Sequence, residues 1–286
     1  MINILSRKKG EFRYGSWILK EKVKFGKPKS PNLILSRFQL SNDYFGITNH
    51  SNEFQVPMSE YPAFYFHGIK TPLIDLNKKR KNSVFMSGNI DTTYYCDISK
   101  SKVFNVLSRR EVADFVMKQK YYLEVDSLEG LKEYIKSDSE HEVLLIDTKE
   151  KFRIPIKDLK SILIQFNFYL ALPGVVIPQS HNLIEAMSVG CIPVIQKKYA
   201  CLFTPPLTQM ENAIIYTNLE ELDSLFLRIF QLKETIIASM QQSVYEYYRM
   251  YLSPKSVVSK IENNEFSKIY IQAEWKSLEL LNRKFC

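Results

Sequence analysis

The sequence predicts an α/β protein with a parallel central sheet, and three observations support that fold class. From about residue 84 onward, short apolar segments of strand length alternate with segments that have helical spacing of apolar residues. This alternation is typical of a parallel sheet with helices on both faces. The composition, with 45% hydrophobic and 24% charged residues, is that of a globular protein. A length of 286 residues is sufficient for two domains.

The first part of the chain predicts short strands and turns. Residues 32–38 and 53–58 have strand character, and an aromatic run at residues 61–67 predicts a buried strand or wall. Residues 77–82 are polar and basic, which suits a linker between domains. We therefore expect an N-terminal domain over residues 1–80.

The elements after the linker alternate in type. Strands are predicted at residues 84–86, 121–125, 143–147, within 161–171, at 192–196 and at 213–216. Helices are predicted at residues 102–118, 128–137, 180–189 and 219–230. We expect residues 81–252 to form a second domain, and residues 253–286 to form a helical segment that packs back on the first.

Several classes of protein are excluded by composition and motif. The chain has only 9 glycines and contains neither G-x-G-x-x-G nor G-x-x-x-x-G-K-[ST], which excludes a dinucleotide fingerprint and a P-loop. The four cysteines form no C-x-x-C, so we expect reduced thiols rather than a disulfide framework or a zinc site. No run of about 18 apolar residues and no signal-peptide pattern occurs, and a cytoplasmic location is therefore expected.

The positive charge is concentrated at the start of the chain. The net charge is +8, and residues 1–30 carry nine basic and two acidic residues. One interpretation is a face for an anionic membrane surface or for a lipid-diphosphate-linked glycan. The other is a solvated edge that lysines protect from aggregation. No nucleic-acid-reading motif is present, so we expect no nucleic-acid partner.

Residues 172–195 are the most informative segment. A strand is expected to end at Pro173-Gly174, and Ser180 is a good N-cap for the following helix. Glu185 comes one turn into this helix, and Gly190 suits its C-cap. In a doubly wound sheet this helix begins at the carboxyl ends of the strands, where ligands bind. Free N–H groups there attract phosphate, and a carboxylate one turn along can accept ribose hydroxyls.

This segment resembles the nucleotide-sugar half of GT-B glycosyltransferases, most closely the exostosin-like group. The resemblance covers roughly residues 83–252 and rests on Gly174, Ser180, Leu183, Glu185, Ala186, Gly190, Cys191, Ile192, Pro193, Val194 and Ile195. It implies two Rossmann-like domains of GT-B type with a cleft between them. It also implies that Glu185 binds the donor ribose and that Ser180, His181 and Asn182 contact the donor. Gly88 and Asn89 resemble the opening of the family's nucleotide-binding domain.

Further candidates complete the predicted site. Arg109 or Arg110 is expected to neutralise the donor diphosphate. The chain has no D-x-D pair, so we predict metal-independent transfer with no cofactor other than a UDP- or GDP-linked sugar as co-substrate. Asp43, Glu60 and His67 are the candidates for a catalytic base from the first domain.

The expected function is therefore transfer of a hexosyl or pentosyl group from a nucleotide sugar to a hydroxyl of a glycan or glycolipid. Two alternatives to this function stay open. The first is an inactive GT-B-like protein that binds glycans or membranes, and the second is a nucleotide-sugar epimerase that needs no acceptor.

Overall fold

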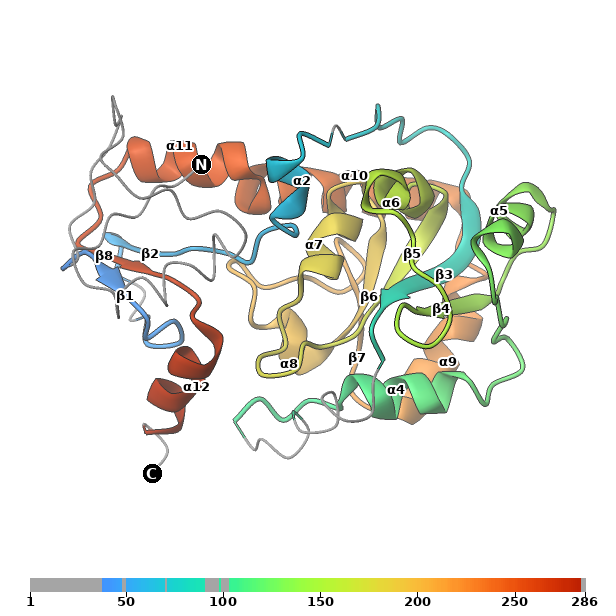
Figure 1. The fold of residues 1–286 in the computed structure, drawn as a ribbon, viewed down its shortest axis with the longest axis horizontal. Helices are drawn as coiled ribbons and strands as arrows, with labels where there is room; N and C mark the ends of the chain where they lie inside the picture. The colour runs from blue at the N-terminus through green and yellow to red at the C-terminus, as the bar shows by residue number, and fades with distance from the viewer. Residues whose placement is uncertain (1–37, 48–49, 70, 91–97, 99–102, 284–286) are drawn as a thin grey trace.

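The computed structural model describes residues 38–47, 50–69, 71–90, 98 and 103–283. These residues form two parallel sheets with helices packed around them (Figure 1). The larger sheet has the strand order β4-β3-β5-β6-β7, and the smaller has the order β1-β8-β2. The predicted α/β class with a parallel sheet is confirmed.

The larger sheet is entirely parallel and is buried on both faces. All its strand pairs are parallel, and every residue of the central strand β5 and of its neighbour β6 is buried. Such continuous apolar strands are what a sheet covered on both sides requires. The strands are β3 (Lys81–Gly88), β4 (Val143–Asp147), β5 (Phe166–Ala171), β6 (Ile192–Gln196) and β7 (Ile214–Tyr216).

Helices cover the two faces of this sheet. In Figure 1, α4 and α9 lie together on one side, while α6 and α7 lie on the other. Local sequence fixes where the helices begin: Ser108 and Glu111 form a capping box for α4, and the Asn218 side chain caps α9. The helices are α4 (Arg109–Val116), α5 (Leu128–Lys136), α6 (Ile156–Leu163), α7 (His181–Met187), α8 (Lys197–Ala200), α9 (Leu219–Ile229) and α10 (Glu234–Tyr247).

The smaller sheet joins the two ends of the described chain. Strand β8 (Lys268–Tyr270) lies between β1 (Leu40–Ser41) and β2 (Glu53–Gln55) and pairs in parallel with both. A π-helical turn, η2 (Tyr248–Leu252), connects α10 to α11 (Pro254–Glu262), and α12 (Glu274–Asn282) follows β8. The sheet has its own small core of Phe54, Val257, Ile261, Phe266 and Ile269.

Several predicted elements differ from the structure. Residues 61–67 contain a short helix, α2 (Ala63–Phe66), rather than a strand, and Pro62 directly before it suits a helix start. The predicted strand at 121–125 is reduced to one bridge, between Tyr122 and Val143. The helix predicted at 102–118 begins only at Arg109 because Ser108 caps it. Within 161–171, α6 continues to Leu163 and the strand starts at Phe166.

The predicted linker at 77–82 is also wrong in part. Lys81 starts β3, and both Arg80 and Lys81 are buried. The tail after residue 252 contains strand β8 as well as helices. The strand predicted at 32–38 and the basic residues 1–30 lie outside the described residues, except for Phe38 in a turn. In the described part of the chain, no helix combines the length and apolarity needed to cross a bilayer.

Candidate functional site

The candidate site lies at the carboxyl edge of the larger sheet. Strand β3 ends at Gly88, and β5 is followed by Pro173-Gly174. Because β3 and β5 are parallel neighbours, these ends meet at the same edge. The turn after β5 is tight, since a Cβ on Gly174 would lie 2.5 Å from the Ile177 carbonyl oxygen. Only glycine fits at this position.

Arg109, the first residue of α4, joins the two strand ends. Its Nε donates to the Pro173 carbonyl at 3.0 Å, and its Nη1 donates to the Asn89 carbonyl at 2.8 Å. The side chain is 3% exposed. A buried guanidinium therefore places a positive charge between the loops that follow β3 and β5. Arg110, by contrast, pairs with Asp114 on the outer side of the same helix at 2.7 Å.

Gly88 permits α7 to approach β3 closely. Asn182 Nδ2 donates to the Ser87 carbonyl at 2.6 Å. A Cβ on Gly88 would lie 2.8 Å from that same Nδ2 atom and 3.1 Å from Arg109 Nη1. Gly88, Arg109 and Asn182 thus form one contact, and any larger residue at 88 would separate it.

Two buried tyrosines lie next to this contact, Tyr169 at Ser87 and Tyr199 at Ser180. Tyr169 is at hydrogen-bond distance from the Ser87 carbonyl, 3.4 Å. Burial is the main cause that raises the pKa of Tyr169, and Glu185 raises it further, whereas Arg109 and Asn182 lower it. The phenol therefore lies near all three of these groups. The Tyr199 hydroxyl accepts from the Ser180 backbone N at 3.0 Å, and burial raises the Tyr199 pKa to about 12. Ser180 is the N-cap residue of α7, but its side chain makes no capping hydrogen bond.

Glu185 lies in the middle of α7 and is 4% exposed. Its Oε1 accepts from the Tyr61 backbone N at 3.1 Å, and its Oε2 makes no hydrogen bond within the described residues. Burial raises the pKa of this carboxyl to about 7; the Tyr61 amide lowers it, Glu60 raises it and Lys160 lowers it. The carboxylate sits in a site that disfavours its charge unless a ligand compensates.

The segment Ser59–Tyr61 lies against α7. His181 Nδ1 is 2.7 Å from the Ser59 carbonyl and donates to it, because a carbonyl oxygen only accepts. The Tyr61 ring contacts the His181 ring edge-on at 5.9 Å. Backbone groups of the N-terminal part of the chain thus contact two residues of the predicted donor helix.

The three predicted bases are placed differently from one another. Glu60 is 3% exposed and forms an ion pair with Lys160 at 2.6 Å. Asp43 follows β1 and lies near Tyr270 of β8; burial raises the pKa of that tyrosine most, and the carboxylates of Glu53 and then Asp43 raise it further. His67 is exposed directly after α2. Of these, only Glu60 lies next to a residue that contacts Glu185, and the identity of the base stays a prediction.

Sequence reasoning did not find Tyr199 and Lys160. Tyr199 follows two exposed lysines, and its burial depends on α8 packing against β6 and β7. Lys160 is 4% exposed on α6, among residues that read as an ordinary amphipathic helix. A lysine on the apolar side of that helix was the available signal for a buried partner.

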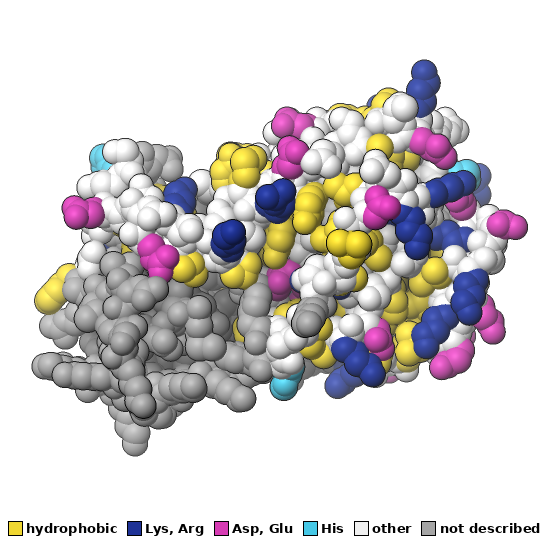
Figure 2. Space-filling view, turned by 90° about the horizontal axis from the view of Figure 1, so that it is seen from above, with side chains coloured by type: hydrophobic (Ala, Val, Ile, Leu, Met, Phe, Trp, Pro, Cys, Tyr) yellow, Lys and Arg dark blue, Asp and Glu magenta, His cyan; other side chains and the backbone are white. Residues whose placement is uncertain are grey.

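A small pocket lies beside the start of α7. It has a volume of about 100 Å³ and lies between the smaller sheet and the loops of the larger one, with Tyr44, Gln55, Gln179 and Thr204 in its lining. Within the described residues, no three His, Cys, Asp or Glu side chains gather as a metal site would require. Figure 2 shows Lys and Arg interspersed with Asp and Glu where described side chains are visible over the larger sheet.

The chain matches no protein-family model and none of the curated proteins in sequence. Among solved structures it is similar to TarM, with a TM-score of 0.41 and 16% identity over 68% of this chain and 37% of that one. It is also similar to the N-terminal domain of trehalose-6-phosphate phosphatase from Candida albicans. There the TM-score is 0.36 and the identity 11%, over 66% of this chain and 43% of that one. The chain spans less than half of either protein.

Proposed function

We propose that the protein is a GT-B-type glycosyltransferase that moves a sugar from a nucleotide diphosphate to a hydroxyl of a glycan or glycolipid. The observation that carries this proposal is the convergence of Arg109, Asn182 and Glu185 around Tyr169 at the carboxyl edge of a parallel sheet. Open α/β sheets bind ligands at this edge. A nucleotide diphosphate offers hydroxyls for a carboxylate and phosphate charge for a guanidinium.

The contacts support the following proposed roles. Glu185 accepts a ribose hydroxyl at Oε2, because Oε1 already accepts from Tyr61 N. Arg109 and the polar groups of Ser180, His181 and Asn182 hold the diphosphate and stabilise its charge as it leaves. Since the sequence contains no D-x-D pair, we propose that this stabilisation needs no divalent metal, so that transfer proceeds equally in EDTA.

Calorimetric titration with UDP, GDP and CMP tests the donor site. We expect one nucleotide to bind, and Arg109→Met and Glu185→Ala each to weaken its binding at least tenfold. A hydrogen bond to a charged group contributes about 1.5–3 kcal/mol, and about 1.4 kcal/mol corresponds to tenfold. Arg110→Ala is the matched control: its neighbour Asp114 holds it away from the site, so affinity should stay within twofold.

Product analysis separates the proposal from its alternatives. A glycosyltransferase gives a glycosylated acceptor from a nucleotide sugar and an oligosaccharide. Conversion of the free nucleotide sugar without acceptor would instead identify an epimerase. Binding of no nucleotide by the folded wild type would contradict the proposal and favour a glycan-binding protein.

We extend the proposal to the basic residues 1–30, which lie outside the described part of the chain. Their nine positive charges suit an anionic membrane or a lipid-diphosphate-linked acceptor on its cytoplasmic face. Changing Lys20, Lys22 and Lys24 to Glu should lower binding to anionic liposomes and activity on a lipid-linked acceptor. If neither liposome binding nor activity changes, the proposed membrane role is wrong. The proposal of the donor site does not depend on that result.

A further inference from the structure

A second pocket lies at the amino end of the larger sheet, opposite the candidate donor site. Its volume is about 330 Å³, within the range of small-molecule sites. The segment before β3, the first residues of β3, Asn167 of β5 and the first turns of α10 line it. Since β3 and β5 run in parallel, this pocket and Gly88 lie at opposite ends of the same strands.

The feature that points to a ligand is Arg80, which lines this pocket. Its side chain is 6% exposed; within the described residues its three guanidinium nitrogens have no oxygen partner, and the polar side chain next to them is the Cys191 thiol. Burial lowers its pKa, and only the Cys191 thiol and the Asp75 carboxylate act in the opposite sense. The thiol is itself directed at the Leu163 carbonyl, at 2.9 Å. A buried charge in this condition is costly unless an anion compensates it.

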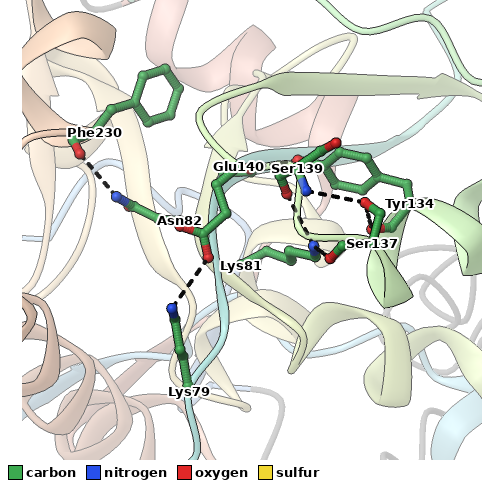
Figure 3. Close-up of polar contacts among 9 residues, drawn as sticks. Lys79, Lys81, Asn82, Tyr134, Ser137, Ser139, Glu140 and Phe230 are labelled. Carbon is green, nitrogen blue, oxygen red and sulfur yellow. Dashed lines mark hydrogen bonds and ion pairs between the residues drawn. The ribbon is translucent and has the colours of Figure 1, made fainter.

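The surroundings of Arg80 favour an oxyanion that also carries a hydroxyl. Three basic residues, Lys78, Lys79 and Arg80, and two acidic residues, Glu140 and Glu234, line the pocket, so one positive charge is in excess. Figure 3 shows Lys79 paired with Glu140 at 3.8 Å and Asn82 Nδ2 donating to the Phe230 carbonyl. The other amide atom, Asn82 Oδ1, is buried and has no partner in the described part of the chain. It needs a donor, such as a hydroxyl.

The first turn of α10 completes the pocket. The N-cap residue Lys233 makes no side-chain capping hydrogen bond, so the N–H groups of Glu234 and Thr235 have no side-chain cap, whereas Ile236 N donates to the Lys233 carbonyl and Glu234 is the acidic residue of this turn. Such uncapped N–H groups favour an anion. The guanidinium fork of Arg80 matches the oxygens of a phosphate in the same way.

We propose that this pocket binds a small phosphate ester with a free hydroxyl, held by Arg80 and the start of α10. Arg80 also lies beside the turn that follows α7, because its Nη2 would be 3.7 Å from a Cβ at Gly190, three residues after the end of that helix. One side chain that lines the pocket is thus next to the turn after the element that carries Glu185. The proposal does not depend on the function of the Glu185 site.

The test is a calorimetric titration with inorganic phosphate and with glycerol 3-phosphate at constant ionic strength. We expect saturable binding to the wild type, tighter for glycerol 3-phosphate because its hydroxyls can donate to Asn82. Arg80→Met should weaken both by at least tenfold. Ala238→Glu places a negative charge at an exposed pocket position of α10 and should have the same effect without disturbing the core.

Ser239→Glu is the matched control, because residue 239 is equally exposed on α10 but does not line the pocket. It should bind both probes as the wild type does. Equal affinity of Ala238→Glu and Ser239→Glu would overturn the proposal, since it would show general attraction to surface lysines. Absence of saturable binding to the folded wild type would also overturn it.

Discussion

Glu185 combines two demands at the scale of one residue. As a buried carboxylate with a pKa of about 7, it disfavours the folded state when it is charged. As a hydrogen-bond acceptor it holds Tyr61 N through Oε1 and leaves Oε2 for a ligand. Residues that bind ligands commonly lower stability in this way, because their polar groups are arranged for a partner rather than for the fold.

Glu185→Gln therefore changes how stability depends on pH. The folded pKa lies above the ordinary value of 4.5, so the folded protein holds a proton that the unfolded chain has lost between about pH 4.5 and 7. Stability of the wild type should fall as pH rises through this window, by about 3 kcal/mol at most. The glutamine variant keeps the acceptor for Tyr61 N and lacks this fall.

Urea unfolding at pH 5, 6, 7 and 8 measures the effect. The stability of the variant relative to the wild type should increase from pH 5 to pH 8. Glu133→Gln, which removes an exposed carboxylate from α5, is the control for charge alone. A difference between Glu185→Gln and wild type that stays constant over this range would contradict the assignment.

At the scale of elements, Lys160 of α6 holds the segment of residues 60–71, which contains α2, through several contacts. Lys160 Nζ forms the ion pair with Glu60, donates to Thr71 Oγ1 at 2.9 Å and lies 4.9 Å from the centre of the Phe64 ring. One buried ammonium thus contacts three points on the segment that contains α2. The same segment contacts Glu185, so the position of Lys160 affects the site indirectly.

Replacing one partner of this ion pair should lower the stability of the protein more than replacing both partners. Lys160→Met leaves Glu60 buried without its counter-charge, and we expect a loss of about 3–5 kcal/mol. The double variant Glu60→Gln/Lys160→Met should recover much of that loss, since neither charge remains. Lys157→Met, an exposed change on α6, is the control and should stay within about 0.5 kcal/mol of wild type. Additive losses in the double variant would show that the pair is not coupled.

At the scale of the whole molecule, the smaller sheet depends on strands from both ends of the described chain. Ile269 N donates to the Gln39 carbonyl at 2.6 Å, and Val56 N donates to the Tyr270 carbonyl at 2.9 Å. The Phe54 and Phe266 rings stack beside this sheet. The larger sheet contains none of these residues, and it has a separate and much larger core.

Ile269→Pro should therefore unfold the smaller sheet selectively. Proline lacks the N–H that pairs with Gln39 and is not tolerated in a central strand. Hydrogen exchange should become faster at Phe54 and Val56 and stay slow at Phe168 and Val194. Trp275→Ala, an exposed change on α12, is the control. Equally fast exchange in both sheets would show that the molecule unfolds as one unit.

The sequence predicted the local elements better than their assembly. Strands such as Val143–Asp147 and Ile192–Gln196 were predicted with their observed bounds because each is a short, continuous apolar run. The pairing of β8 with β1 and β2 was not predicted, because local periodicity carries no information on distant partners. The same limit applies to the site: adjacent Arg109 and Arg110 differ only in which one the capped start of α4 directs inward.

The central position of β8 also sets an order of events during synthesis. Glu53 of β2 and Tyr270 of β8, whose side chains are hydrogen-bonded, are 217 residues apart in the chain. At roughly 5–20 residues per second, a ribosome needs roughly 10–40 s to cover that interval. Throughout this time β1 and β2 have emerged without the strand that separates them. The larger sheet can assemble in the meantime, so the smaller sheet is the last part of the nascent protein to form, and chaperones have their longest access to it.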